Sequence, residues 1–193
     1  MKKLILLCIL VLSMIGCSAL QTTPGDTYQI DSVKGKVLTS NYLVYEKDFV
    51  TLEENYHATS IVIKNSILGN SQRLEFDLYY YPKEKELYAF FPLYSGHILK
   101  EVIISNGIDV LSLKITNFSN FGSNKNPHTF LSKEKAVLLE KILKSPAPII
   151  MRAIHNDEIY DLTFADKYRS GMLELLEVYF GKKIYNIDFS LKG

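Results

Sequence analysis

The sequence predicts an α+β domain, in which an antiparallel β-sheet built of hairpins carries two helices on one face. Two observations support this fold class. Segments with apolar residues at alternate positions dominate from Tyr28 to about Thr116, and turn residues separate them. Two segments with helical spacing follow in the C-terminal half, with one more hairpin between them. The chain has 193 residues, which is enough for one domain with its own core, and we place that domain at residues 28–193.

The first part of the domain is predicted to consist of strands. Residues 60–64, Ser-Ile-Val-Ile-Lys, are a strand candidate. Residues 73–81 alternate polar and apolar over six positions, so one face of this strand should contact water. The charged segment 82–86 is predicted to form a turn, and residues 87–91 the returning strand of a hairpin.

A second hairpin is predicted over residues 98–116, with Asn106-Gly107 as its turn. Asn-Gly is the pair most typical of two-residue hairpin turns. Residues 117–128 are rich in Asn, Ser, Gly and Pro and are predicted to be an exposed loop. Asn124, Asn126 and His128 are interpreted as part of that loop rather than as ligands.

The C-terminal part begins with a helix predicted from Lys133 to about Lys144. Ser132 is its expected N-cap, and the prolines in Ser-Pro-Ala-Pro at 145–148 end it. Residues 149–154 and 158–164 form a third predicted hairpin. Asp166 is expected to cap a last helix that ends near Phe180, with Gly181 as the C-terminal cap. A short strand over 184–189 is a further expectation.

The chain opens with Lys2 and Lys3, followed by an apolar run from Leu4 to Ile15. A basic start before an apolar stretch indicates a secretory signal. Twelve helical residues would extend about 18 Å, which is short of the roughly 30 Å hydrocarbon layer. Extending the run through Leu20 gives seventeen residues, so an uncleaved signal anchor remains an alternative, as does a plain secretory signal.

Residues 13–17, Ser-Met-Ile-Gly-Cys, resemble the lipobox of bacterial lipoprotein signal peptides. The resemblance covers residues 1–17, and Met14 and Ile15 depart from the usual leucine and small residue. It implies that signal peptidase II cleaves between Gly16 and Cys17, removes residues 1–16, and leaves Cys17 as the lipid attachment site, with palmitate among its acyl chains. Two or more acyl chains hold a protein on a bilayer stably.

Localisation follows from this resemblance. Cys17 and the polar, Pro-Gly-containing segment after it would form a flexible tether over residues 17–27. The predicted location is the cell envelope, through covalent lipid in the membrane. Ser18 stands where an aspartate would resemble an inner-membrane retention signal, so the outer membrane is favoured if the cell is Gram-negative.

Residues 132–180, a helix, prolines, a hairpin and a helix, are similar to the ends of small uncharacterised bacterial lipoproteins. This similarity covers under a third of the chain and contains no catalytic signature. It implies a fold and no activity.

Composition excludes several classes of function. Net charge is +1, and loss of residues 1–16 would leave 20 basic and 21 acidic residues, so no nucleic-acid partner is expected. The only cysteines are Cys8 and Cys17, so residues 18–193 can form neither a disulfide nor a Cys-ligated metal site.

No residue pattern indicates catalysis, a metal or a cofactor. The four histidines are not spaced three or four apart, and no phosphate loop or nucleophile elbow is present. Ser95-Gly96-His97 is better interpreted as a turn than as part of a catalytic triad. Residues 155–158, His-Asn-Asp-Glu, suit a polar hairpin turn better than a metal site.

The aromatic residues are the most suggestive feature of the domain. The chain has 13 Tyr, 10 Phe and no Trp, and Tyr79, Tyr80 and Tyr81 are consecutive. In a strand, Tyr79 and Tyr81 share one face and Tyr80 takes the other. Together with Tyr88 and with Phe90, Phe91 and Tyr94 nearby, they could form a binding surface. Tyrosine suits such a surface because it combines large area with a hydroxyl group. The alternative is that they simply pack the sheet.

Two functional hypotheses follow. The first is a membrane-anchored envelope lipoprotein whose domain is a non-enzymatic binding module, with an envelope protein as a possible partner. The second is a tethered envelope hydrolase whose site is not visible in sequence. A concave pocket with two converging carboxylates would favour the enzyme, and a flat or aromatic face with scattered acids would favour the binding module. A third option is simple structural packing within an envelope complex.

Overall fold

The structure is a computed structural model that describes most of the domain. The described residues are 27–30, 34–38, 43–48, 50–60, 65–67, 70–72, 75–92, 99–121, 124–156, 158–164 and 166–185. For Lys167, and for the described residues that fall within 27–38, 59–72 and 117–126, only the backbone is described. The predicted signal segment, Gly16 and Cys17 therefore lie outside the described residues, as do residues 61–64 of the strand candidate at 60–64.

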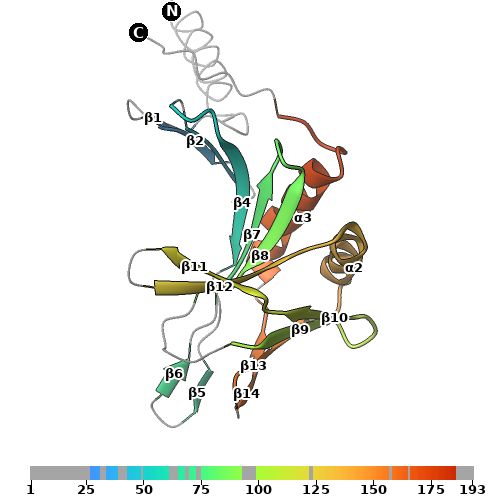
Figure 1. Ribbon diagram of the computed structural model, residues 1–193. Coiled ribbons are helices and arrows are strands. Elements are labelled where there is room, and N and C mark those ends of the chain that lie inside the picture. The colour runs from blue at the N-terminus through green and yellow to red at the C-terminus, as the bar shows by residue number, and fades with distance from the viewer. Residues whose placement is uncertain are drawn as a thin grey trace, which may run out of the picture.

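Antiparallel strands form one large and one small sheet, with an additional two-stranded ribbon (Figure 1). The large sheet has the order β1-β2-β3-β4-β7-β8-β12-β11. Its strands are β1 (Thr27–Ile30), β2 (Lys34–Leu38), β3 (Leu43–Asp48), β4 (Glu54–Ser60), β7 (Phe76–Tyr81), β8 (Glu86–Phe90), β11 (Asn117–Phe121) and β12 (Asn124–Phe130). The small sheet, β10-β9-β13-β14, contains β9 (Glu101–Ser105), β10 (Val110–Lys114), β13 (Ile150–Ile154) and β14 (Ile159–Thr163). The ribbon pairs β5 (Asn65–Ile67) with β6 (Asn70–Gln72).

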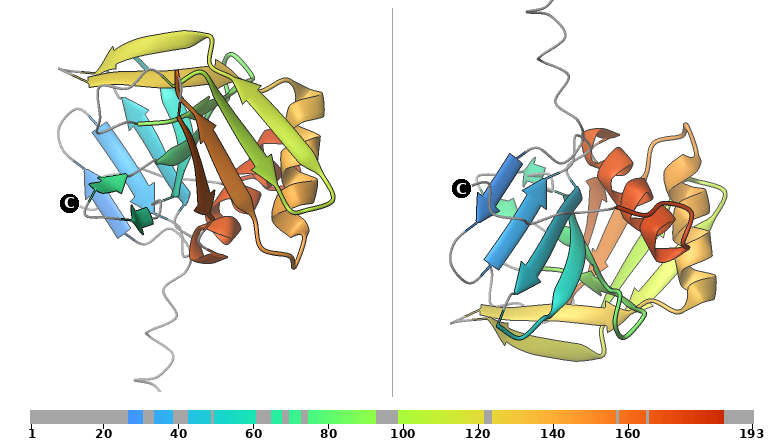
Figure 2. Two further views of the ribbon diagram at one scale, coloured as in Figure 1. Left: turned by 90° about the horizontal axis from the view of Figure 1, so that it is seen from below. Right: turned by 90° about the horizontal axis from the view of Figure 1, so that it is seen from above.

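Within the described residues, two α-helices, α2 (Lys133–Lys144) and α3 (Arg169–Tyr179), complete the α+β arrangement. They contact each other, and α3 also contacts β3, β4 and β7 while α2 contacts β10. Figure 2 shows the helices side by side on one side of the strands. The predicted fold class is thus confirmed, although the single sheet expected from sequence is divided into two sheets and a ribbon.

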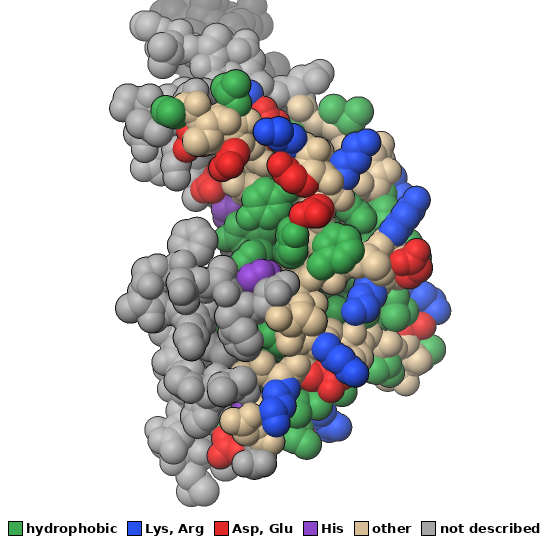
Figure 3. Space-filling model, viewed as in Figure 1, with side chains coloured by type: hydrophobic (Ala, Val, Ile, Leu, Met, Phe, Trp, Pro, Cys, Tyr) green, Lys and Arg blue, Asp and Glu red, His purple; other side chains and the backbone are tan. Residues whose placement is uncertain are grey.

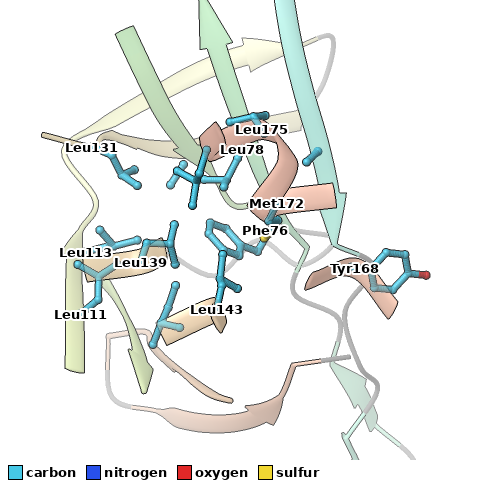
Figure 4. Packing of buried hydrophobic residues seen from close by; sticks show 14 of the residues in the cluster. Phe76, Leu78, Leu111, Leu113, Leu131, Leu139, Leu143, Tyr168, Met172 and Leu175 are labelled. Atoms are coloured by element: carbon cyan, nitrogen blue, oxygen red, sulfur yellow. The ribbon is translucent and has the colours of Figure 1, made fainter. Parts of the chain in front are cut away.

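One continuous core joins the two sheets and both helices. Phe76 of β7 is completely buried and stacks on Phe91, with their ring centroids 5.3 Å apart. Around it lie side chains from the small sheet and from both helices, including Leu113, Leu139 and Met172 (Figure 4). Burial of such side chains is the main contribution to the stability of this fold.

Three predicted hairpins are present. Strand β7 pairs with β8, β9 with β10, and β13 with β14. The turn of the second hairpin differs from the prediction, because Ser105 pairs with Val110 and the turn therefore has four residues rather than two. The Asn106 side chain accepts hydrogen bonds from the backbone N–H groups of Ile108 and Asp109 (3.0 and 2.8 Å), which stabilises the longer turn. Gly107 has φ +86°, a backbone conformation that suits glycine.

The prediction of a loop at residues 117–128 is wrong. This segment forms β11 and most of β12, which pair with Phe121 opposite Asn124. Tertiary pairing overrides the turn-like composition, because β12 also pairs with β8 on its other side. Pro127 lacks an N–H group, but its carbonyl accepts a hydrogen bond from the Phe91 N–H at 2.8 Å.

The helix predictions are confirmed with one exception. Ser132 is the N-cap of α2, with its side chain accepting from the Lys135 N–H, and Gly181 follows α3 with φ +68°. Asp166 does not cap α3; it begins a 3₁₀ turn, η1 (Asp166–Tyr168), and pairs with Arg169 at 2.6 Å. The N-cap position of α3 is Tyr168. Of the strand expected over 184–189, residues 184 and 185 form no strand and the rest lie outside the described residues.

Candidate functional site

The candidate site lies on the face of the large sheet that points away from α3. Antiparallel pairing places His57 opposite Tyr79, Tyr79 opposite Tyr88, and Tyr88 opposite Phe130. These four side chains form one row across β4, β7, β8 and β12. Neighbouring residues in a strand point to opposite faces. Accordingly, Tyr80 is on the other face, where its ring meets Tyr179 of α3 at 5.3 Å.

Seven aromatic rings make up this surface, which we call the outer aromatic face. Its members are His57, Tyr79, Tyr81, Tyr88, Phe90, His128 and Phe130. His57 stacks on Tyr79 with centroids 5.0 Å apart, and Phe90 stacks on His128 at 4.8 Å. Tyr79 and Phe90 meet edge to face at 4.9 Å, which links the two stacked pairs. Such geometries are favourable for aromatic rings and stabilise the arrangement of the seven side chains.

The outer aromatic face contacts solvent in spite of its apolar character. Phe130 is 45% exposed, and the other six rings are partly exposed. In the space-filling view, hydrophobic side chains gather over β7 and β8, with acidic side chains along one border and a histidine beside them (Figure 3). The sheet thus has a buried side packed on the core and a second, aromatic side that contacts water.

An open hollow of about 340 Å³ forms one end of this face. Its lining residues are Tyr81, Glu84, Glu86, Tyr88, Phe90 and His128. Glu84 belongs to the turn between β7 and β8, and Glu86 begins β8. The Tyr88 hydroxyl donates a hydrogen bond to Oε2 of Glu86 at 2.6 Å, which holds this ring beside the carboxylate.

Acidic groups dominate the electrostatics of the face. The pKa of Tyr88 is raised to about 12, first by its hydrogen bond to Glu86 and then by burial and by the charges of Glu86 and Glu84. Burial raises the pKa of Tyr81, and the charges of Glu53, Glu84 and Glu46 act in the same direction. Both hydroxyls remain protonated at neutral pH, in a region of negative potential.

The three predicted residues Tyr79, Tyr81 and Tyr88 lie together on this face, with Tyr81 and Tyr88 at 6.0 Å. Of the aromatic residues expected beside them, Phe90 lies on this face, Phe91 is buried in the core, and Tyr94 lies outside the described residues. His57, His128 and Phe130 were not predicted. His128 and Phe130 alternate along β12 and so share a face, but their position beside Tyr88 depends on the pairing of β12 with β8. No local pattern specifies that pairing. The period-two spacing at 128 and 130 was the one available signal.

Other candidates do not assemble into a site within the described residues. Ser95-Gly96-His97 lies outside them. His155 is buried, and its ring meets Tyr160 edge to face at 5.4 Å. Among described residues, no group of three or more His, Cys, Asp or Glu side chains could hold a metal ion. Within the same residues, no helix is both long enough and apolar enough to cross a membrane.

Comparisons with known proteins identify no family. No protein-family model matches the chain, and no curated protein matches it. Among solved structures, the crystal structure of invasion associated protein B from Bartonella henselae is weakly similar. It has a TM-score of 0.37 and 7% sequence identity, over 81% of this chain and 98% of that chain. A likeness at this level assigns neither a fold family nor a function.

Proposed function

We propose that the protein is a lipid-anchored envelope lipoprotein whose domain is a non-enzymatic binding module. The binding surface is the outer aromatic face, and the partner is an envelope protein. One observation is the main support for this proposal. Seven aromatic rings contact one another on the solvent side of the large sheet, and none of them belongs to the hydrophobic core on its other side. Clustered aromatic residues on a surface are typical of sites where proteins bind partners.

The partial exposure of these rings provides a favourable free energy of binding. Rings such as Phe130, Phe90 and Tyr88 keep part of their area in water, and a partner that covers them removes this area from solvent. The Tyr81 hydroxyl can donate to or accept from polar groups of the partner, and the Tyr88 hydroxyl, which donates its hydrogen to Glu86, can accept from them. Tyrosine has few rotatable bonds, so little conformational entropy is lost on binding.

The anchor is supported by the sequence alone. Cleavage between Gly16 and Cys17 would remove the apolar segment, and lipid on Cys17 would hold the domain at the membrane through the polar tether that follows. The outer membrane is the favoured location in a Gram-negative cell. Metabolic labelling with radioactive palmitate tests this part: the natural chain should be labelled and Cys17→Ser should not. Labelling of the serine variant would refute the anchor.

Photo-crosslinking in living cells tests the binding surface. Phe130 is replaced by p-benzoylphenylalanine in the full chain, which adds a photoreactive group at the edge of the outer aromatic face. Val137 on α2 is the matched control, because it is 50% exposed and lies on a helix rather than on this face. We expect discrete adducts from position 130 and none from position 137. Equal adducts from both positions, or none from position 130, would contradict the proposed surface.

A second candidate, an envelope hydrolase, rests on the two carboxylates of the hollow, Glu84 and Glu86. Most glycoside hydrolases use a pair of carboxyl groups that flank the scissile bond. Here Glu84 is exposed in a turn and Glu86 accepts a hydrogen bond from Tyr88. Binding is therefore the better supported of the two. Release of reducing sugar ends from isolated cell-wall glycan, lost in Glu84→Gln and in Glu86→Gln, would instead favour the enzyme.

A further inference from the structure

The hollow at the outer aromatic face is lined by residues whose chemistry indicates which group of the partner binds in it. Building on the proposed function, we propose that it receives a cationic side chain, arginine in particular, from an extended basic segment of the partner protein. The geometry for this comes from an aromatic wall and a carboxylate rim that lie side by side. Tyr81, Tyr88 and Phe90 supply the rings, and Glu84 and Glu86 supply the charge.

The charge of the residues in and around the hollow is the first observation that supports a cationic occupant. The hollow is lined by two carboxylates, and its described lining contains no lysine or arginine. Lys83 and Lys85 extend from the same turn as Glu84, and both are exposed, but neither lines the hollow. Glu46 and Glu53 act on the Tyr81 hydroxyl from the β3 side. A cation entering the hollow therefore meets negative charge on two sides.

The aromatic wall is the second support. The face of an aromatic ring attracts a cation, and tyrosine rings do so more strongly when water is excluded. Tyr81 and Tyr88 stand nearly perpendicular, at 79°, so the hollow offers a ring face and a ring edge to its occupant. A guanidinium group can stack on the face and donate two parallel hydrogen bonds to a carboxylate. Glu86 accepts from Tyr88 through one oxygen, and a carboxylate can accept several more hydrogen bonds.

The volume and charge of the hollow disfavour a small molecule, an anionic lipid surface and a second copy of the chain as its occupant. About 340 Å³ is near the lower limit of small-molecule pockets, which are roughly 300–1,000 Å³, and suits one long side chain. An anionic lipid surface would be repelled by the glutamates. A second copy of the chain would bring the same carboxylates together in a symmetric contact, which like charges oppose.

Fluorescence anisotropy with a defined peptide tests the inference. The probe is a fluorescein-labelled peptide, Gly-Ser-Arg-Gly-Ser-Arg-Gly-Ser-Gly, added to the full chain purified in a neutral detergent. The control peptide carries citrulline in place of both arginines, because citrulline keeps the planar shape and removes the charge. We expect the arginine peptide to bind at least tenfold more tightly, and its affinity to fall as salt is raised.

Substitutions of glutamates test whether the arginine peptide binds in the hollow. Glu84→Gln combined with Glu86→Gln should weaken binding of the arginine peptide at least fivefold and bring it close to the citrulline peptide. The matched control is Glu158→Gln, an exposed carboxylate beside the small sheet, which should leave binding unchanged. Circular dichroism of each variant shows that the fold is retained. Equal weakening by Glu158→Gln would overturn the assignment to the hollow.

The remaining outcomes separate this inference from the proposed function. Equal binding of both peptides, or of neither, would overturn the cationic occupant. If crosslinking from position 130 still succeeded, the proposed function would stand. Loss of that crosslink as well would refute both the cationic occupant and the proposed function. Binding to phosphatidylglycerol vesicles through the same face, or concentration-dependent dimerisation that Phe130→Ala abolishes, would likewise overturn the arginine assignment in favour of that other occupant.

Discussion

Consecutive tyrosines have different roles in this protein, because a strand divides them between its two faces. Tyr80 points to the core side and meets Tyr179 of α3. Tyr79 and Tyr81 point to the outer aromatic face, where their rings stack 6.5 Å apart. Residue type alone therefore does not distinguish a core tyrosine from a surface one. The position along the strand does, since its period is two residues.

Buried tyrosines should make the protein sensitive to alkaline pH. Burial raises the pKa of Tyr56 to about 12, whereas an exposed tyrosine in the unfolded chain ionises near pH 10. Between these values the unfolded state loses a proton that the folded state keeps, so stability falls as pH rises. The slope reaches about 1.4 kcal/mol per pH unit for one such group. Below pH 10 this contribution is complete and constant.

Tyr56→Phe tests this expectation. The variant keeps the ring that contacts Tyr45 at 4.8 Å and removes the ionisable hydroxyl. Urea unfolding followed by circular dichroism, repeated from pH 8 to pH 11.5, should give a shallower loss of stability above pH 10 than in the natural chain. An unchanged slope would show that Tyr56 does not contribute.

Two phenylalanines should differ in what they contribute to stability. Phe76 is fully buried and Phe130 is 45% exposed. Phe76→Ala removes a large core side chain and leaves a cavity, which should cost about 3–5 kcal/mol. Phe130→Ala should cost about 1 kcal/mol or less, because its ring loses little burial. Denaturant unfolding of both variants measures the difference, and equal losses would place the outer aromatic face in the core rather than on a binding surface.

At the scale of elements, local signals were sufficient for some segments and not for others. The bounds of α2 follow from Ser132 and the prolines after Lys144, and the hairpin of β7 and β8 follows from the charged turn between them. The pair β11 and β12 could not be predicted, because its composition indicates a loop and its strands are held by a partner distant in sequence. His128 and Phe130 of the outer aromatic face were not predicted for the same reason.

The N-cap of α2 gives an element-scale prediction. Ser132 Oγ accepts a hydrogen bond from the Lys135 N–H at 3.4 Å, and Glu134 adds a negative charge in the first turn. Ser132→Ala should destabilise the protein by about 1 kcal/mol, and Ser132→Asp should restore most of the loss because aspartate also caps. Thermal unfolding of the two variants measures this. If both variants lost the same stability, packing around the residue rather than capping would be the cause.

For the whole molecule, the central question is whether two sheets make one folding unit or two. Their buried residues belong to a single cluster, in which Leu113 of the small sheet and Phe76 of the large sheet are both fully buried. Both helices belong to the same cluster, and α2 links the two parts by contacting β10 as well as α3. A shared core of this kind favours all-or-none unfolding.

A substitution in the small sheet should therefore destabilise the large sheet equally. Leu113→Ala removes a fully buried side chain and should cost about 2–5 kcal/mol. Tyrosine fluorescence reports mainly on the large sheet, where Tyr45, Tyr56 and the outer tyrosines lie, and far-ultraviolet circular dichroism reports on the helices and strands together. In the natural chain and in the variant, both signals should show one transition with the same midpoint. If Leu113→Ala shifted only the circular dichroism and left the tyrosine transition in place, the sheets would be separate cooperative units, and the outer aromatic face would rest on a structure independent of the helix-covered small sheet.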